Sequence, residues 1–149
     1  MQLIRVIAVL TLMFAGLAGA GMAQDAPSLI ALSERLQGEA EARAEALDGG
    51  NDPVLAADDS FLADTARFSA DMRALALHID THGGPADLPC IFRGMAEDAD
   101  VRRTALETAP AADDYRELAR TFSHAVIIAA DVETEGPDTG FPPSCPSAG

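Results

Sequence analysis

Residues 78–93 read HIDTHGGPADLPCIFR, and this stretch decides how the chain folds. One helical pattern ends at about His82, the residues Gly-Gly-Pro at 83–85 predict a turn, and a second helical pattern begins two or three residues later. Glycine and proline in this arrangement are typical of a helix end. The stretch also holds two of the three histidines and one of the two cysteines, so most of the candidate chemistry gathers at this corner.

The pattern before the corner is the strongest periodic signal in the chain. It begins at the cluster Asp58-Asp59-Ser60, whose side chains can accept hydrogen bonds from the free amides of a first helical turn. It then runs to about His82. Its core face recurs at every third or fourth position, as on one side of a helix, and consists of Phe61, Thr65, Phe68, Met72, Leu75 and Ile79.

A third helix is predicted after the corner, from Asp87 or Leu88 to the residue before Pro110. Its apolar stripe is weaker and consists of Leu88, Ile91, Met95, Ala99, Arg102 and Leu106. Arg102 interrupts this stripe. In so acidic a chain we expect it to pair with an acidic side chain, although it could also extend to solvent or line a pocket for an anionic ligand.

Two more helices flank this central pair. The first covers residues 27–47 and stops at the sequence DGGNDP of residues 48–53. Its stripe is Leu29, Leu32, Leu36, Ala40, Arg43 and Leu47. The last begins at Asp113, where Asp114 and Glu117 have the spacing of a capping box. Its stripe is Tyr115, Leu118, Phe122, Ala125, Ala129 and Val132.

Together these patterns predict an all-α fold. Four helices joined by short turns predict an antiparallel up-down-up-down four-helix bundle over residues 24–133, and no strand pattern competes with it. Residues 134–149 are rich in proline and glycine and predict an extended C-terminal tail. A long apolar stripe serves equally well as the core of a monomer or as a dimer seam, so a homodimer stays open.

Residues 1–23 have the pattern of a cleaved signal peptide. Arg5 precedes an apolar segment, and the small residues Gly21 and Ala23 lie three and one before a cut at Gln24. Cleavage after Ala20 is the alternative. The apolar run is too short for a membrane span, and no cysteine is placed to carry a lipid anchor. We therefore expect an exported bacterial protein, periplasmic or secreted, with no membrane span in the mature chain.

Charge narrows the classes of partner. The chain has 24 acidic residues, no lysine and a formal net charge of −14. Such a charge argues against binding to nucleic acid or to an anionic membrane, because both would repel it. A protein, a small molecule or a metal cation remains open as the partner.

The two cysteines, Cys90 and Cys145, predict a disulfide, because an even number of cysteines in an exported protein usually pairs. Closing so long a loop stabilises the folded state by about 4 kcal/mol through the chain entropy it removes from the unfolded state. The bridge would pin the C-terminal tail to the start of the third helix. A free, reactive Cys90 thiol near a helix N-terminus is the alternative, but the Cys-x-x-Cys pattern of redox proteins is absent.

His78 and His82 are four residues apart, a spacing at which two imidazoles can bind one metal ion. Asp71 lies on the same helical stripe, and His124 of the fourth helix could approach from across the bundle. Zn²⁺ or Cu²⁺ would suit these ligands. The alternative, which we favour, is that the two histidines are surface residues whose charged form complements the C-terminal end of a helix dipole.

No catalytic signature accompanies these residues. The chain lacks the His-Glu-x-x-His pattern of metalloproteases, the Gly-x-Ser-x-Gly turn of hydrolases, a Cys-x-x-Cys-His haem site and a complete calcium loop. The sequence therefore favours a non-enzymatic binding or interaction module that needs no cofactor. A divalent-metal-binding protein that uses the histidine pair is the alternative, and an enzyme without a recognisable motif stays open.

Overall fold

A computed structural model describes residues 26–51, residues 59–132 and Cys145. Within these residues the fold is all-α, without a strand, as the sequence predicts. The proposed signal peptide at 1–23 lies outside the described residues, and so does the tail at 134–149 apart from Cys145. The four helices are α1 (Ala26–Asp48), α2 (Ser60–His82), α3 (Leu88–Thr108) and α4 (Ala112–Val132).

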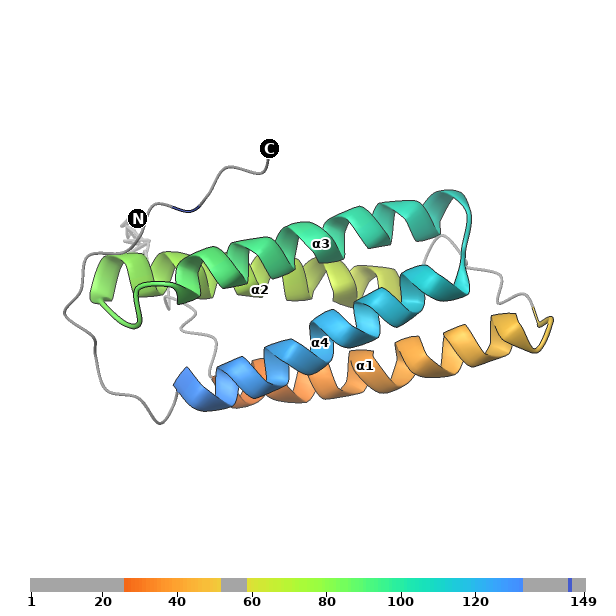
Figure 1. The fold of residues 1–149 in the computed structure, drawn as a ribbon, viewed down its shortest axis with the longest axis horizontal. Coiled ribbons are helices and arrows are strands. Elements are labelled where there is room, and N and C mark those ends of the chain that lie inside the picture. Colours follow the sequence, from red (N-terminus) through yellow and green to blue (C-terminus); the bar gives the residue numbers. More distant parts are fainter. Residues whose placement is uncertain (1–25, 52–58, 133–144, 146–149) are drawn as a thin grey trace, which may run out of the picture.

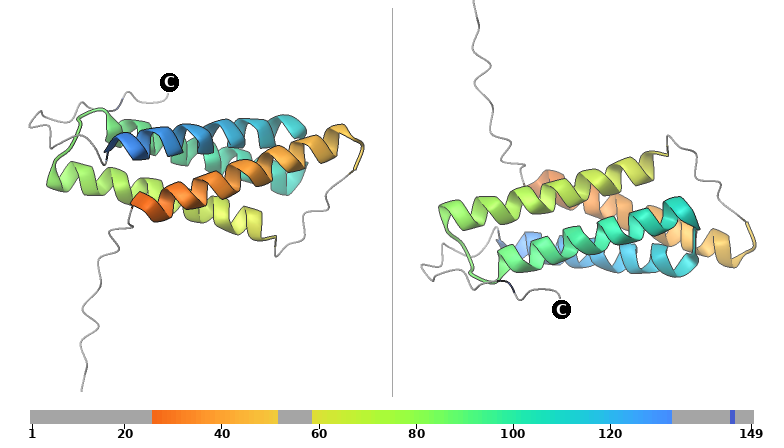
Figure 2. Two further views of the ribbon diagram at one scale, coloured as in Figure 1. Left: turned by 90° about the horizontal axis from the view of Figure 1, so that it is seen from below. Right: turned by 90° about the horizontal axis from the view of Figure 1, so that it is seen from above.

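The helices form a bundle of two pairs (Figure 1). Helix α1 packs along α4, and α2 packs along α3, whereas the contacts between the pairs are fewer. Figure 1 shows the turn between α2 and α3 at one end of the molecule and the turn between α3 and α4 at the opposite end. Figure 2 shows the same two pairs from two opposite sides. The corner at residues 78–93 therefore lies at one end of the bundle.

The sequence signals at the ends of α2 act as predicted. Asp59 is the N-cap, and its carboxylate accepts a hydrogen bond of 2.9 Å from the amide of Phe61. At the other end the Gly83 amide donates to the carbonyl of Ile79 at 2.9 Å, and Gly83 has a φ of 90°. Only glycine adopts such a backbone conformation without steric cost. These two residues set the length of α2.

The start of α4 differs from the prediction. The helix begins at Ala112, so Asp113 and Asp114 both lie in its first turn. The expected capping box between Asp114 and Glu117 is replaced by other contacts: Asp114 accepts a hydrogen bond of 3.0 Å from Arg102, and Glu117 pairs with Arg120. The two aspartates still favour this end of the helix, because carboxylates stabilise the positive end of the helix dipole.

The centre of the core is a cluster of aromatic rings from α2 and α4. The ring centroids of Phe68 and Phe122 are 4.9 Å apart at an interplanar angle of 86°, and Phe61 lies 5.5 Å from Tyr115 and 6.4 Å from Phe122. All four side chains are fully buried. Edge-to-face pairs of this kind add to the free energy gained by burying apolar area. The cluster therefore joins the two helix pairs through their side chains.

Helix α3 buries only part of the predicted sequence stripe. Leu88, Ala99 and Leu106 are buried as expected, whereas Ile91 is 36% exposed and its neighbour Phe92 is fully buried. The core face runs through Leu88, Phe92, Ala96 and Ala99, so it departs from the predicted stripe at Ile91 and Met95. Arg102 lies near this face and binds Asp114, which confirms the expected pairing with an acidic side chain.

Replacing Phe122 tests the aromatic cluster. We expect Phe122→Ala to lower the free energy of unfolding by about 3–5 kcal/mol, because it removes a buried ring and leaves a cavity against Phe61 and Phe68. Urea unfolding followed by circular dichroism measures this change. Ile127→Ala, at a position on the same helix that is 58% exposed, is the matched control and should cost much less. Equal losses in both variants would contradict the assignment of the core.

Candidate functional site

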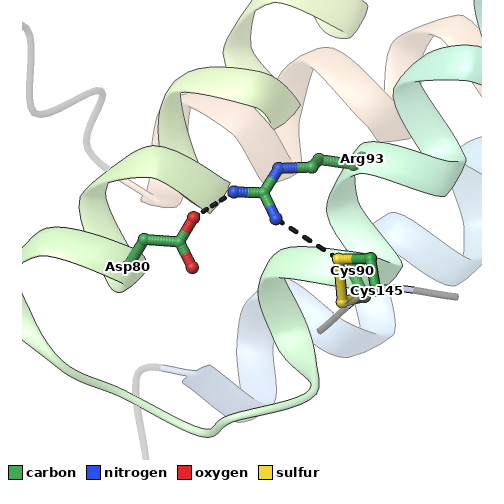
Figure 3. Close-up of a disulfide and its surroundings, with 4 residues drawn as sticks. All are labelled: Asp80, Cys90, Arg93 and Cys145. Carbon is green, nitrogen blue, oxygen red and sulfur yellow. Dashed lines mark hydrogen bonds and ion pairs between the residues drawn. A yellow bond between two sulfur atoms is a disulfide. The ribbon is translucent and has the colours of Figure 1, made fainter. Parts of the chain in front are cut away.

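The corner between α2 and α3 carries a disulfide, as the sequence predicts. Cys90 bonds to Cys145, and their Cα atoms are 5.2 Å apart (Figure 3). Cys90 lies in the first turn of α3, where Pro89 precedes it, and is half-buried, whereas Cys145 is exposed. The bridge spans 55 residues of sequence, so it ties the segment after α4 to the start of α3.

Arg93 joins this disulfide to α2. Its guanidinium donates from Nη1 to the Sγ of Cys145 at 3.3 Å, and from Nη2 it pairs with the carboxylate of Asp80 (Figure 3). Asp80 lies on α2, Arg93 on α3, and Cys145 follows α4 in the chain. One positive side chain therefore contacts two other segments of the chain at the corner.

The predicted histidine pair lies at the C-terminal end of α2. Both side chains are exposed, and the rings of His78 and His82 stack with centroids 4.3 Å apart and an interplanar angle of 21°. The Nδ1 of His82 lies 2.8 Å from the Thr81 hydroxyl and 3.1 Å from the His78 carbonyl. The spacing of four residues therefore brings the rings together, as the sequence indicates.

The other two predicted metal ligands lie apart from this pair. Asp71 lies earlier on α2, where it is buried, and its Oδ2 is 3.7 Å from the Nε of Arg67. His124 is an exposed residue of α4. In the part of the chain that the structure describes, no three histidine, cysteine or acidic side chains form a group that could hold a metal ion. A metal site here would thus consist of two protein ligands and water.

A groove of about 410 Å³ lies between α1 and α4, and the sequence analysis did not identify it. The small side chains Ala119 and Ser123 leave space there, and the exposed Ile127 follows Ser123 by one helical turn. The groove is lined by Gln37, Glu41, Arg116, Ala119, Arg120 and Ser123. Cavities of this size that combine apolar walls with a few polar groups are typical ligand sites.

The charged side chains of this groove already have partners. Arg116 pairs with Asp48 and Asp113, and these contacts raise the pKa of its guanidinium, with the hydrogen bond to Asp48 as the main cause. Arg120 pairs with Glu117 within α4. Exposed ion pairs of this kind contribute little to stability. A ligand that binds the two guanidinium groups would therefore displace weak interactions.

Between α2 and α3 a second groove, of about 430 Å³, is lined by Arg73, Arg93 and Glu97. Asp100 lies beside it on α3 and pairs with Arg73. Burial raises the pKa of the Asp100 carboxyl, but the hydrogen bonds from Arg73 and Ser69 and the charges of Arg73 and Arg103 together outweigh burial, so that the pKa lies below its usual value. The three side chains that line this groove are charged, and its surface is more polar than that of the groove between α1 and α4.

A further charged cluster is structural. Arg43 of α1 donates to both carboxylate oxygens of Asp59, at 3.0 and 3.1 Å, and to Glu39 at 2.7 Å, and it lies 4.9 Å above the ring of Phe61. Burial opposes the charge of Arg43, but the hydrogen bonds to Asp59 and Glu39 raise the pKa of the guanidinium above its usual value. Burial also raises the pKa of the neighbouring Tyr115 phenol. The cluster holds the start of α2 against α1.

None of the described helices is both long and apolar enough to cross a lipid bilayer. Comparison of the chain with protein-family models, with curated proteins and with solved structures found no match.

Proposed function

We propose that this chain is an exported, non-enzymatic binding module that holds a small amphipathic carboxylate in the groove between α1 and α4. The observation that carries the proposal is the groove itself, which has a volume of about 410 Å³ and is lined by two small side chains and two arginines among others. Its volume lies within the range of small-molecule sites, roughly 300–1,000 Å³.

The groove favours one chemical class of ligand. The surface of the groove is mainly apolar, which suits an aliphatic chain, and the guanidinium groups of Arg116 and Arg120 can bind a carboxylate. The lining contains two positive groups and one negative group, Glu41. The two arginines also pair with Asp48, Asp113 and Glu117, so a carboxylate ligand would have to displace these side chains. Physiological salt screens the more distant negative charge of the chain beyond about 8 Å.

The proposed architecture has two finer parts. We infer that the helices run antiparallel, up-down-up-down, over residues 24–133, and the positions of the helix turns in Figure 1 support this. We also infer that residues 134–149 form an extended tail held at Cys145. The fold would then present a rigid groove between α1 and α4, and a rigid site binds a ligand at a lower entropic cost.

Octanoate is the probe for the groove. We expect it to shift the amide signals of groove residues in an NMR titration of the ¹⁵N-labelled protein. Arg120→Gln should weaken binding about tenfold, the effect of one charge-assisted hydrogen bond. Ser123→Leu should abolish binding, because the larger side chain fills the groove. Octan-1-ol, which lacks the carboxylate, should bind equally to the wild type and to Arg120→Gln.

Two matched substitutions away from the groove serve as controls. Arg67→Gln removes another exposed arginine that forms an ion pair within its own helix, and Thr104→Leu places the same leucine side chain on the surface of α3. Both should bind octanoate as the wild type does. If octanoate does not bind the wild type, or if it binds Arg120→Gln and Ser123→Leu as tightly as the wild type, the proposed site is refuted.

A second candidate function is binding of a divalent metal ion, Zn²⁺ or Cu²⁺, by His78 and His82. The stacked, exposed rings favour it, because both side chains reach solvent from adjacent turns of α2. At one hundred times the dissociation constant, bound metal should stabilise the wild type by about 2.7 kcal/mol and raise its melting temperature. The variant His78→Ala/His82→Ala should show no such rise, whereas Thr104→Ala should keep it. If metal raises the melting temperature of the double variant, the metal binds elsewhere. If metal does not raise the melting temperature of the wild type, the proposed metal site is refuted.

Export is tested by the mass of the mature protein. Expressed in a Gram-negative bacterium, the chain should appear in the periplasmic fraction without residues 1–23, or without residues 1–20 if the second cleavage position is used. Mass spectrometry of the purified protein distinguishes the two products. Ala23→Leu should move the cut to Ala20 or block it, because the signal peptidase requires a small residue before the cut. Full-length protein in the cytoplasm would contradict the proposed location.

A further inference from the structure

We propose that the Cys90–Cys145 disulfide reacts with thiols by thiol–disulfide exchange, and that Arg93 promotes the reaction by stabilising the departing sulfur of Cys145. The proposal goes beyond ligand binding and does not depend on it. Three observations carry it: the accessibility of the bridge, the contact between Arg93 and Cys145, and the position of Cys90 in the first turn of α3.

The bridge can be reached by another molecule. Cys145 is exposed and Cys90 is half-buried, and both lie at the corner between α2 and α3 (Figure 3). The aromatic cluster that holds the helices together involves neither cysteine. An incoming thiol therefore needs no unfolding of the bundle to contact the bridge.

Both sulfurs lie where a thiolate is stabilised. The guanidinium of Arg93 donates to the Sγ of Cys145 at 3.3 Å, and it would donate more strongly to the same atom as a thiolate. Cys90 lies in the first turn of α3, where the helix dipole favours negative charge. Thiols beside a positive group or at a helix N-terminus ionise at lower pH, and thiols of lower pKa depart faster in exchange.

Asp80 pairs with the same guanidinium. It binds Nη2 of Arg93 from α2, while Nη1 donates to the sulfur of Cys145 (Figure 3). The carboxylate of Asp80 therefore reduces the net positive charge beside the sulfur. In this proposal Arg93 acts on the departing sulfur, Asp80 weakens that action, and the reacting atoms are the two sulfurs.

The substrate class is a dithiol, and the reaction balances. A thiolate of the dithiol attacks Sγ of Cys90, forming a mixed disulfide, and the bonding pair of the bridge leaves with Sγ of Cys145 as a thiolate beside Arg93. The second thiolate of the substrate then attacks the substrate sulfur of the mixed disulfide and releases Cys90 as a thiolate. The substrate is oxidised to a disulfide by two electrons, and the bridge is reduced to two cysteines. Two protons pass from the substrate thiols to the two cysteines or to water.

The test is the rate of reduction of the folded, oxidised protein by dithiothreitol. Samples are quenched with an alkylating reagent and analysed by mass spectrometry, and circular dichroism before and after reduction confirms that the helices persist. Four proteins are compared: the wild type, Arg93→Gln, Asp80→Asn and Arg35→Gln. Arg35 is the matched control, because it also forms an ion pair between two helices and is about as exposed as Arg93, at 50% and 46%.

The two variants at the corner, Arg93→Gln and Asp80→Asn, separate an electrostatic role of Arg93 from a structural role. Both break the ion pair between α2 and α3, but only Arg93→Gln removes the positive charge from the sulfur. We expect Arg93→Gln to react at least about threefold more slowly than the wild type, the effect of raising the pKa of the leaving thiol by about one unit. Asp80→Asn should react as fast or faster, and Arg35→Gln should not change the rate. An unchanged rate in Arg93→Gln, or faster reduction in both corner variants, would overturn the proposal.

Glutathione identifies the sulfur that is attacked. Short exposure of the wild type to reduced glutathione, followed by acid quenching and peptide mapping, traps the mixed disulfide. We expect the adduct on Cys90, because Cys145 leaves beside Arg93. An adduct found only on Cys145 would overturn the assigned roles of the two cysteines.

Discussion

Aromatic rings from α2 and α4 join the two helix pairs of this protein. The backbones of these two helices are not neighbours in the bundle, since α2 packs on α3 and α4 packs on α1. Phe61 and Phe68 nevertheless contact Phe122 across the centre of the core. Because these rings are fully buried between the two pairs, the relative position of the grooves and of the corner depends on them. A substitution that moves these rings would therefore also move the candidate sites relative to one another.

Charge acts at the edges of this core. Every arginine in the described ranges forms an ion pair, and several of these pairs connect different helices, among them those of Arg43 with Asp59 and Arg102 with Asp114. The chain has far more carboxylates than arginines, so most of the negative charge stays on the surface and keeps the protein in solution. Several of the positive groups lie along the helices and each binds a carboxylate of a neighbouring helix.

The sequence predicted the features that depend on local chemistry. Helix ends followed from Asp59 and Gly83, and the disulfide followed from the number of cysteines. On α3 the prediction was wrong only in part: Leu88, Ala99 and Leu106 are buried, but Ile91 and Phe92 are apolar neighbours and the periodicity could not tell which one faces the core. The groove between α1 and α4 could not be predicted either, because it depends on which helix faces meet. The small size of Ala119 and Ser123 was its only sequence signal.

The disulfide has two opposing effects on its own reactivity. A bridge that stabilises the fold by about 4 kcal/mol resists reduction by the same amount, which corresponds to a reduction potential lower by roughly 85 mV. Arg93 and the N-terminus of α3 act in the opposite direction, because they stabilise the two thiolates that reduction produces. The stabilisation of the fold by the bridge thus lowers the driving force for exchange, whereas the charges around the sulfurs lower the barrier of the exchange reaction. Since the bridge lies outside the aromatic core, the helices can persist in either redox state, and exchange requires no unfolding.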